Sequence, residues 1–470
     1  MASSAIDSEI FGNLFGTSAM RQIFADESLI QRYLDVEAAL ARVQARMGII
    51  PKEAAAEITA KAKFDNFNFE EYKRGVARVS YPILPLVEGI VAMCKDGLGE
   101  YSHWGTTTQD IMDSALSLQI RDALAIIETD LSAVADLLAG LAREYRDVPV
   151  AGRSHLQHAL PVTFGYKAAV WLSGIERHRT RLAELKPRAT LVQFGGAVGT
   201  LASLGEDGLK TQDALADELG LGRPEISWHT MRDNVAEIVT WMGLLTGTLG
   251  KIGTDVLMMM QTEVGEVFEA FEHGRGASST MPQKRNPVSC ELMLVAARTM
   301  RQHVAQMLDG MLQDHERASG AWHLEWLTVP QSFIITAGAL SQARDLLDGL
   351  EVDTKRMRAN LDITNGMIAS EAVMMGLAPH MGRQVAHDVV YDACRDAVQR
   401  GKSLYDVLSS VPQITDALSD DDIRTMCDPA NYTGLAGDMV DRMLQTCGRE
   451  AKRKPTPIKR ARLPKPWDIA

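Results

Sequence analysis

Long stretches of helical periodicity limit what this chain can fold into more than any other feature. Apolar residues recur every three or four positions over residues 110–146, 163–185, 231–269 and 290–313, and several of these stretches far exceed the average helix of about 11–12 residues. Helices gain most of their stability by packing an apolar face against a neighbour. The sequence therefore predicts an all-α fold with a bundle of long helices at its centre.

The segment 239–260 is apolar on nearly all sides of its predicted helix. Such a helix lies either at the centre of a bundle or at an interface between subunits, and its periodicity fits both positions. Aromatic residues make up only 6% of the chain, whereas Ala, Leu, Met and charged residues are plentiful. This composition also favours long helices over sheet.

The 470 residues exceed the usual size of one domain, and breaks in the helical pattern indicate three domains. Residues 1–110 read as short helices and loops, including a helix that begins at Asp26. Residues 111–365 form the predicted helical bundle. Residues 366–470 form a small helical domain, interrupted by Pro and Gly, with a basic, Pro-rich tail.

Charge, cysteine content and hydropathy exclude several classes of protein. The net charge of −12 argues against nucleic acid as the main partner. Five scattered cysteines form no Cys-x-x-Cys pair, so we expect buried free thiols rather than disulfides or a zinc site. The first residues lack a signal-peptide pattern, and no stretch reaches the roughly 20 apolar residues of a membrane span. We expect a soluble cytoplasmic protein that uses no metal or other cofactor.

A run of hydroxyl residues stands just before the first long helix. It reads His103-Trp104-Gly105-Thr106-Thr107-Thr108-Gln109-Asp110. Ser, Thr and Asp ahead of a helix are usually caps, which is one interpretation of this run. The free N–H groups at a helix start also attract anions, so the second interpretation is an anion-binding turn that includes Thr107 and Thr108.

Two further polar stretches separate the predicted helices. Residues 152–163 contain His155 and His158, and a lone histidine is more often a structural residue than a catalyst. Residues 274–287 combine two glycines, two serines, a lysine, an asparagine and two prolines. A solvated polar loop is one interpretation of the second stretch. Its flexible backbone, hydroxyls and cation are also typical of a loop that closes on an anion.

The stretch 274–287 resembles the signature Gly-Ser-Ser-x-Met-Pro-x-Lys-x-Asn-Pro of the fumarase/aspartase superfamily. The matching residues are Ser278, Ser279, Met281, Lys284 and Asn286. The resemblance implies that Ser278 is the catalytic base and that the others bind substrate. Ala277 stands where the pattern has glycine, which predicts a stiffer loop that closes at a different rate without changing the reaction.

The other two polar stretches resemble two further regions of that superfamily. The first is similar to His-x-Gly-x-Thr-Ser-x-Asp, which implies carboxylate binding by Thr107 and Thr108 and places His103 in the site. The second is similar to Arg-Thr-His-x-Gln, with Ser154 keeping the hydroxyl of the threonine. This similarity implies that His155 acts on the leaving group.

Glu291 follows the signature loop at the position of a family glutamate that pairs with the catalytic histidine. The resemblance implies that Glu291 orients the imidazole of His155 and raises its basicity. A carboxylate in the first turn of a helix is also favoured by the helix dipole, and both interpretations hold together.

The chemistry that the resemblance implies is elimination next to a carboxylate. A base removes a weakly acidic C–H proton, and the resulting dianion needs positive charge and hydrogen-bond donors around it. Lys284, Asn286 and N–H groups of the loop are predicted to supply them. Ser278 would be the base, and His155 with Glu291 would protonate the leaving group.

Sequence similarity extends along most of the chain and is strongest to the 3-carboxy-cis,cis-muconate cycloisomerase branch. It includes Gln193-Phe194-Gly195-Gly196-Ala197 and His315-Glu316-Arg317. Arg317 would bind a second acidic group, the alternative being a surface salt bridge of little energy. Bacterial cycloisomerases typically carry Trp where this chain has His155, which favours a lyase that releases fumarate from an amine or another group.

The resemblance also implies a homotetramer whose active sites combine the three polar stretches from different subunits, with a small di- or tricarboxylate as substrate. Three alternatives stay open. The first is lactonisation of a carboxymuconate, and the second is adenylosuccinate cleavage. The third is a non-catalytic structural relative, against which the intact set of Ser278, Lys284, Asn286 and His155 argues.

Overall fold

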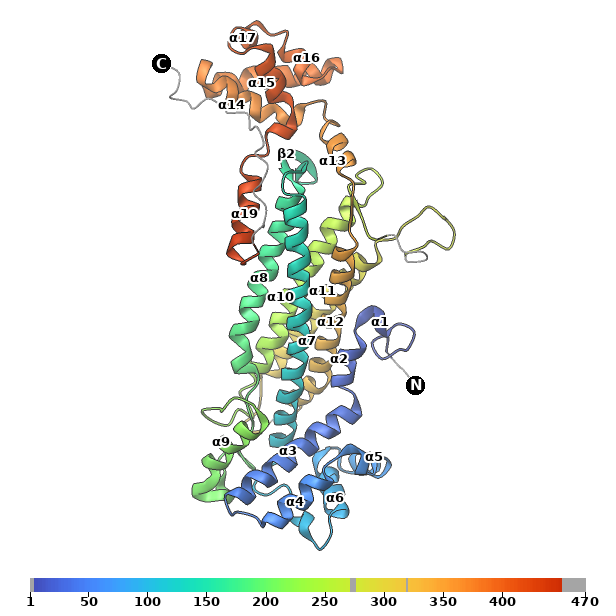
Figure 1. Cartoon of the computed structure of the whole chain (residues 1–470), viewed down its shortest axis with the longest axis vertical. Coiled ribbons are helices and arrows are strands. Elements are labelled where there is room, and N and C mark those ends of the chain that lie inside the picture. The colour runs from blue at the N-terminus through green and yellow to red at the C-terminus, as the bar shows by residue number, and fades with distance from the viewer. Residues whose placement is uncertain (1–3, 271–275, 318–319, 450–470) are drawn as a thin grey trace. The chain divides into compact units, whose positions relative to one another are not determined.

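The structure is a computed structural model that describes residues 4–270, 276–317 and 320–449. Helices dominate it, as Figure 1 shows, and the predicted all-α class is confirmed. In these ranges no helix is both long and apolar enough to cross a membrane. All five cysteines are free, but only Cys290 is fully buried, so the expectation of five buried thiols was wrong.

The longest helices of the described residues have between 23 and 37 residues. They are α7 (Thr108–Glu144), α8 (Phe164–Ala189), α10 (Asp233–Met259), α11 (Val288–Gly310) and α12 (Ala321–Asp348).

Four of these five helices were predicted. One of the four was predicted too long, and the fifth helix was missed. The stretch 231–269 was expected to be helical throughout, but α10 ends at Met259 and a turn leads into the short strand β3 (Val267–Phe268). Helix α12 was not predicted. It contains Pro330 together with several β-branched residues, which weaken the helical signal although packing maintains the helix.

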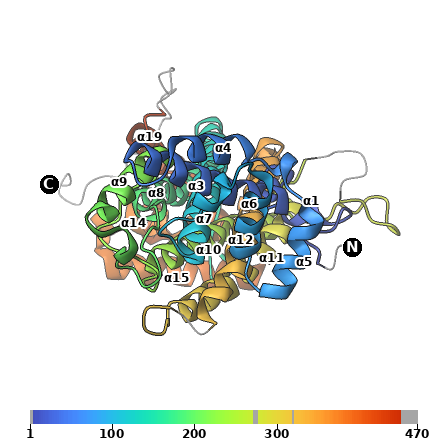
Figure 2. The same ribbon diagram turned by 90° about the horizontal axis from the view of Figure 1, so that it is seen from below.

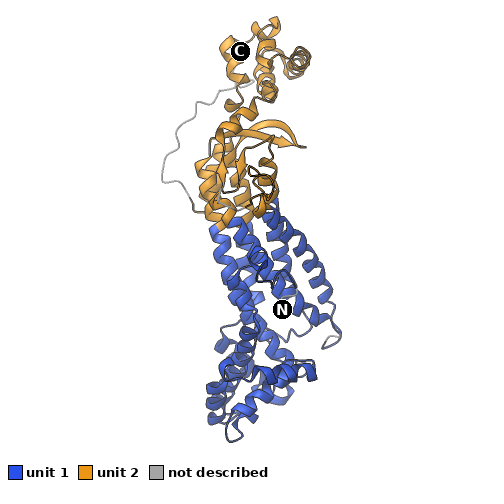
Figure 3. Ribbon diagram, turned by 90° about the vertical axis from the view of Figure 1, so that its right-hand side faces the viewer, with its two compact units in different colours: residues 1–133, 177–251, 291–344 blue, residues 134–176, 252–290, 345–470 orange. Residues whose placement is uncertain are grey.

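The chain divides into two compact units, which Figure 3 distinguishes by colour. Unit 1 comprises residues 1–133, 177–251 and 291–344, and unit 2 comprises residues 134–176, 252–290 and 345–470. Each of the five longest helices contributes residues to both units. The proposed three-domain boundaries at residues 110 and 365 stay a prediction.

Unit 1 adds shorter helices to its shares of the long ones. They are α1 (Gly12–Phe15), α2 (Ser18–Ile23), α3 (Asp26–Arg46), α4 (Lys52–Lys61), α5 (Phe69–Val79), α6 (Ile83–Met93) and α9 (Gly208–Leu219), with 3₁₀ turns η1 (Phe64–Asn66), η2 (Leu98–Tyr101) and η3 (Ala202–Asp207).

Helix α3 organises the core of unit 1. It packs against α4 and α9, which lie beside it in Figure 2. Its acidic first turn and its last-turn Arg46 suit the helix dipole. Leu34 and Leu40 on its apolar face are buried with Leu86 of α6 and Leu215 of α9. This core fixes one end of α7, where the first predicted site residues lie.

Unit 2 contains two small antiparallel sheets and the C-terminal helices. The strands are β1 (Pro149–Ser154), β2 (Gln157–Thr163), β3 and β4 (Glu351–Val352), pairing β1 with β2 and β3 with β4. The helices are α13 (Thr354–Leu361), α14 (Ser370–Met381), α15 (Arg383–Arg400), α16 (Leu404–Leu408), α17 (Pro412–Thr415), α18 (Asp420–Cys427) and α19 (Ala436–Thr446), with 3₁₀ turns η4 (Met367–Ala369) and η5 (Pro429–Asn431).

Helices α14 to α17 gather into a compact group in Figure 1. Val373 and Leu377 of α14, Val390 of α15 and Leu404 of α16 share one buried cluster. Glycines or prolines lie at the ends of these helices, and the group has its own core.

Candidate active site

Asp110 is the centre of a buried hydrogen-bond network in the first turn of α7. Its side chain is 1% exposed and accepts hydrogen bonds from the backbone N–H groups of Thr107 (3.0 Å), Gly195 (2.9 Å) and Gly196 (2.8 Å). The Nε2 atom of His229 lies 2.7 Å from the same carboxylate. These bonds join the turn before α7 to the 195–196 backbone. The carboxylate of Asp110 thus binds the N–H of the residue before the helix, which is one half of a capping box, and holds the turn in one conformation. Within the described residues, no threonine of this run caps the helix through its side chain.

Arg317 brings a positive charge to this turn. Its guanidinium donates a hydrogen bond to Oγ1 of Thr107 (3.0 Å) and another to the carbonyl oxygen of Ala197 (2.5 Å). Among the described residues no carboxylate forms an ion pair with Arg317. Thr108 is half-buried beside Thr107 at the start of α7. Unit 1 thus presents a fixed cation, hydroxyls and a helix N-terminus together, which suits a carboxylate.

His103 has a buried partner that the sequence analysis did not identify. Its Nδ1 lies 2.6 Å from Glu37 of α3, and its backbone N–H donates to the other oxygen of that carboxylate (2.9 Å). Glu37 is 0% exposed. Burial alone lowers the pKa of His103, but the Glu37 carboxylate outweighs burial and raises the pKa above its ordinary value. The glutamate fixes the ring and favours its protonated form.

His155 lies at the tip of the β1–β2 hairpin, in a two-residue turn. Ser154 pairs with Gln157, so His155 and Leu156 form the turn, with φ of +50° and +63°. Two-residue hairpins of type I′ need positive φ at both positions, which normally selects Asn and Gly. Both side chains are exposed, Leu156 by 76%. Strained backbone at non-glycine residues is typical of functional turns.

The end of the hairpin next to its turn is fixed by an ion pair with a buried glutamate. Arg153 donates to both carboxylate oxygens of Glu266, at 2.9 and 2.6 Å, and Glu266 is 0% exposed. Asn360 of α13 donates to the same carboxylate (2.8 Å). A bidentate pair with a third donor holds its geometry well. The hairpin therefore presents Ser154 and His155 from a rigid support.

Ser278 is half-buried in the signature loop and receives two backbone hydrogen bonds. Its Oγ accepts from the N–H groups of Met281 (3.0 Å) and Thr280 (3.3 Å). Donors directed at a hydroxyl oxygen stabilise negative charge on it. Ser279, Met281 and Lys284 are exposed.

The base of the loop is closed by Asn286. Its backbone N–H and its side-chain Nδ2 both donate to the carbonyl oxygen of Gly276, each at 3.0 Å, and Ala277 bridges to Arg285. Gly276 has φ of +64°, and a Cβ there would lie 2.7 Å from the Asn286 carbonyl oxygen. Only glycine fits this position. The glycine required by the loop is therefore Gly276, next to the departure at Ala277.

Two more residues position the loop where it joins α11. The carboxylate of Glu269 accepts from the N–H groups of Ser289 (3.1 Å) and Cys290 (2.9 Å) and so caps the helix. Arg285 binds Glu351 of β4 at 2.9 and 3.1 Å and also donates to the Glu269 carbonyl oxygen. Glu291 follows in the first turn of α11, with an exposed side chain.

The predicted site residues thus fall into two groups. Unit 1 contains His103, Thr107, Thr108, Arg317 and Glu291, and unit 2 contains Ser154, His155, Ser278, Ser279, Met281, Lys284 and Asn286. Thr107 and Arg317 are in direct contact, whereas His155 and Glu291 belong to different units and their pairing stays a prediction.

The residues that sequence reasoning missed are all carboxylates that hold others in place. They are Glu37, Asp110, Glu266 and Glu269. Asp110 had a sequence signal, because it stands in the run 103–110 at the start of the first long helix. The described residues contain no group of three or more His, Cys, Asp and Glu side chains placed to hold a metal ion.

Known proteins match the chain over most of its length. The family model described as Lyase matches residues 15–301, and the model described as Adenylosuccinate lyase C-terminus matches residues 366–443. A fumarate lyase from Mesorhizobium sp. BNC1 is a structural neighbour with 52% identity and a TM-score of 0.86, covering 92% of this chain and 98% of its own.

Two curated relatives carry different activity names. Trans-aconitate decarboxylase 1 of Mycosarcoma maydis is 48% identical over 92% of this chain and 88% of its own length. The 3-carboxy-cis,cis-muconate cycloisomerase of Pseudomonas aeruginosa is 46% identical over 93% of this chain and 96% of its own length. The chain therefore belongs to the fumarase/aspartase superfamily, as an enzyme with the lyase or cycloisomerase type of activity found there.

Proposed function

We propose that this enzyme catalyses reversible β-elimination from a substituted succinate, breaking a carbon–nitrogen bond to give fumarate and an amine. The observation that carries the proposal is the environment of Ser278. Two backbone N–H groups donate to its Oγ, so a deprotonated serine is stabilised where the loop also offers the cation Lys284. A hydroxyl prepared in this way is a base for a weakly acidic C–H bond.

In the proposed reaction, Ser278 Oγ takes a proton from the methylene carbon next to one carboxylate. The C–H electrons move into that carboxylate and form a dianion, which Lys284 and the N–H groups of the loop stabilise. The electrons then form the carbon–carbon double bond while the adjacent C–N bond breaks. The leaving nitrogen takes its proton from His155, and Glu291 orients that ring.

The second carboxylate of the succinate would bind at the start of α7. Thr107, Thr108 and Arg317 offer hydroxyls and an unpaired cation there, and Asp110 holds the turn. A bidentate guanidinium contact fixes the orientation of a carboxylate, which brings the reacting carbon to the base. His103, oriented by Glu37, adds a second positive group.

The proposed active unit is a homotetramer whose sites combine residues of different subunits. His155 and Leu156 are exposed on their hairpin, and α10, α11 and α12 of unit 1 expose large apolar side chains at Leu244 (53%), Leu308 (51%) and Leu327 (60%). Apolar residues exposed on long helices are typical of subunit interfaces. Sedimentation equilibrium measures the assembly, and a monomer with full activity would contradict it.

Lactonisation of a carboxymuconate is the second candidate, favoured by the 46% identity to a cycloisomerase. The name of the Mesorhizobium neighbour, fumarate lyase, and the retained His155 favour elimination instead. Because the second activity would not need a histidine acid at this position, His155→Trp should suppress elimination much more than lactonisation.

The experiment that tests the proposal runs the reaction in the addition direction. Fumarate absorbs in the ultraviolet, so its loss is followed with a panel of amines and thiols, while 3-carboxymuconate and trans-aconitate are tested in parallel. Loss of fumarate with an amine supports the proposal and identifies the leaving group. Turnover of carboxymuconate or trans-aconitate without any addition to fumarate would refute it.

A further inference from the structure

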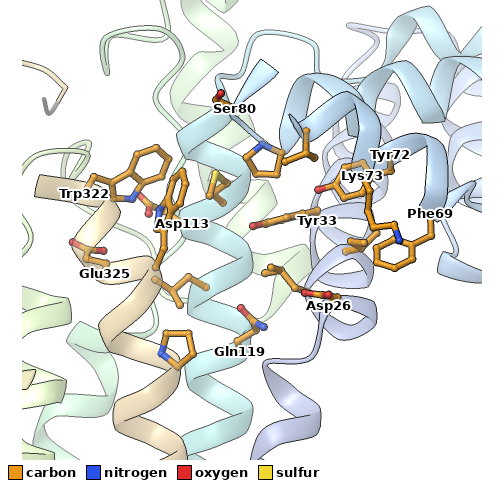
Figure 4. A pocket seen from close by; sticks show the side chains of 18 residues that line it. Asp26, Tyr33, Phe69, Tyr72, Lys73, Ser80, Asp113, Gln119, Trp322 and Glu325 are labelled. Atoms are coloured by element: carbon orange, nitrogen blue, oxygen red, sulfur yellow. The ribbon is translucent and has the colours of Figure 1, made fainter. Parts of the chain in front are cut away.

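Unit 1 contains a cavity of about 410 Å³ that none of the predicted site residues lines. Its walls come from α3, α5, α7 and α12, as Figure 4 shows, and all of its lining residues belong to unit 1. The volume falls in the range of pockets for small organic molecules, roughly 300–1,000 Å³.

Two largely buried tyrosines line this cavity, and their hydroxyl groups form no hydrogen bond with any described residue. Tyr33 is 3% exposed and Tyr72 is 8% exposed. Figure 4 shows both hydroxyls pointing the same way, into the space facing Asp113 and Trp322. Burial raises the pKa of both tyrosines, so each keeps its proton and offers one donor and one acceptor.

The cavity wall carries excess negative charge. Arg232 lies between Asp113 (2.8 Å) and Glu325 (2.5 Å), and all three side chains are at most 1% exposed. One cation between two carboxylates gives this group a formal charge of −1 when both are ionised, and Asp113 and Glu325 line the cavity. Burial raises the pKa of Glu325 above its ordinary value. Asp113 is therefore the more readily ionised of the two. The other lining charges, Asp26 and Lys73, balance each other. A buried negative wall repels carboxylates and attracts cations.

The remaining walls are aromatic. Phe69 and Trp322 line the cavity on opposite sides in Figure 4, and Trp326 packs edge-on against Trp322 with ring centroids 5.1 Å apart. Together with Tyr33 and Tyr72 they offer five aromatic rings. Aromatic faces attract organic cations, and the attraction strengthens in a water-poor site.

We propose that this cavity binds a small organic cation, a protonated amine on an aromatic or alicyclic body. The body lies between the aromatic walls, and the ammonium group donates hydrogen bonds to the Tyr33 and Tyr72 oxygens while facing the negative charge of the Asp113–Arg232–Glu325 group. The dicarboxylate of the proposed reaction is excluded on charge. The site therefore stands independently of the proposed function.

The test compares three probes of nearly equal size and different charge on the full-length protein: 2-phenylethylamine, 2-phenylethanol and 3-phenylpropionate. Isothermal titration calorimetry or ligand-observed NMR measures each dissociation constant. We expect the amine to bind about tenfold more tightly than the alcohol, the size of a buried cation–π contribution, and the acid not to bind. Equal binding of the acid and the amine, or no binding of any probe, would overturn the proposal.

Variants locate the binding site. Tyr33→Phe combined with Tyr72→Phe keeps the rings and removes the hydroxyls, and should weaken amine binding about tenfold, whereas Tyr166→Phe in unit 2 should not change it. Val76→Phe fills the cavity and should abolish binding of both the amine and the alcohol. If the affinity survives Val76→Phe, the amine binds elsewhere. Ser278→Ala should retain amine binding even if the proposed elimination proves wrong.

Discussion

The turn before α7 in unit 1 and the signature loop in unit 2 both contain predicted site residues, but the turn is held by buried hydrogen bonds and the loop is largely exposed. The turn is held by a buried carboxylate, because Asp110 accepts three backbone hydrogen bonds and contacts His229. The loop is closed at its base by Asn286, and most of its side chains are exposed.

From this difference we expect the turn to bind a substrate carboxylate and the loop to cover the reacting carbon. A preorganised turn binds a carboxylate without reorganisation, which lowers the free energy needed to bring substrate and base together. A loop with few side-chain contacts opens and closes at low cost, as a loop that covers the reacting carbon must. Mutations in the turn should therefore affect stability and activity together, and mutations in the loop should affect activity alone.

The largest effect is expected for Ser278→Ala in the loop. Removal of a general base lowers kcat by about 10²- to 10⁴-fold, and a half-buried loop serine contributes little to the free energy of unfolding. Steady-state kinetics and thermal unfolding measure the two quantities. Thr280→Ala keeps the N–H donor to Ser278 and is the matched control. Wild-type turnover by Ser278→Ala would show that Ser278 is not the base.

Asp110→Asn tests the turn. The amide keeps the shape but replaces charged hydrogen bonds with weaker ones and introduces a mismatched donor, so the free energy of unfolding should fall by about 3 kcal/mol. Denaturant unfolding measures the loss, and KM should rise as Thr107 and Arg317 lose their positions. Asp207→Asn, at a half-exposed surface position in the same unit, should change neither. A stable Asp110→Asn variant would contradict the rigid-turn interpretation.

Gly276→Ala and Ala277→Gly test the loop without touching a catalytic group. The first introduces a Cβ 2.7 Å from the Asn286 carbonyl oxygen at a positive φ, a strain of about 1–3 kcal/mol that should open the base of the loop and lower kcat. The second restores the glycine of the superfamily pattern and should change kcat less than tenfold, with unfolding unaltered. Equal kcat for the wild type, Gly276→Ala and Ala277→Gly would show that loop geometry does not limit turnover.

The smallest effect concerns pH and the His103–Glu37 pair in unit 1. Because the pKa of folded His103 is raised above its ordinary 6.5, protonation stabilises the fold fully below about that pH, and this stabilisation is lost as pH rises through the raised pKa. Chemical denaturation between pH 5 and about 9 measures the slope. Glu37→Gln should flatten it, whereas His380→Gln should leave it unchanged. An unchanged slope in Glu37→Gln would mean that Glu37 does not raise the pKa of His103.

Several features were readable from local sequence because they depend on residues close in the chain. The helix from Asp26, the starts of α7, α8 and α11, and the signature loop follow from periodicity and motif. The β1–β2 hairpin was not predicted, because His155-Leu156 lacks the Asn or Gly that normally marks such a turn. Helix α12 was missed because Pro330 interrupts its pattern.

The sequence by itself determined the helical class and the superfamily, and it predicted the chemical groups of the site, since apolar spacing and short motifs are local properties. Only the tertiary structure decided which of these groups form hydrogen bonds with which partners. Glu37 lies 66 positions from His103, and Gly195 lies 85 positions from Asp110, yet both pairs are hydrogen-bonded. Tertiary packing brings these residues together, and no local pattern encodes a contact between residues so far apart in the chain. The cavity that Tyr33 and Tyr72 line has the same origin, because its walls come from four separate helices.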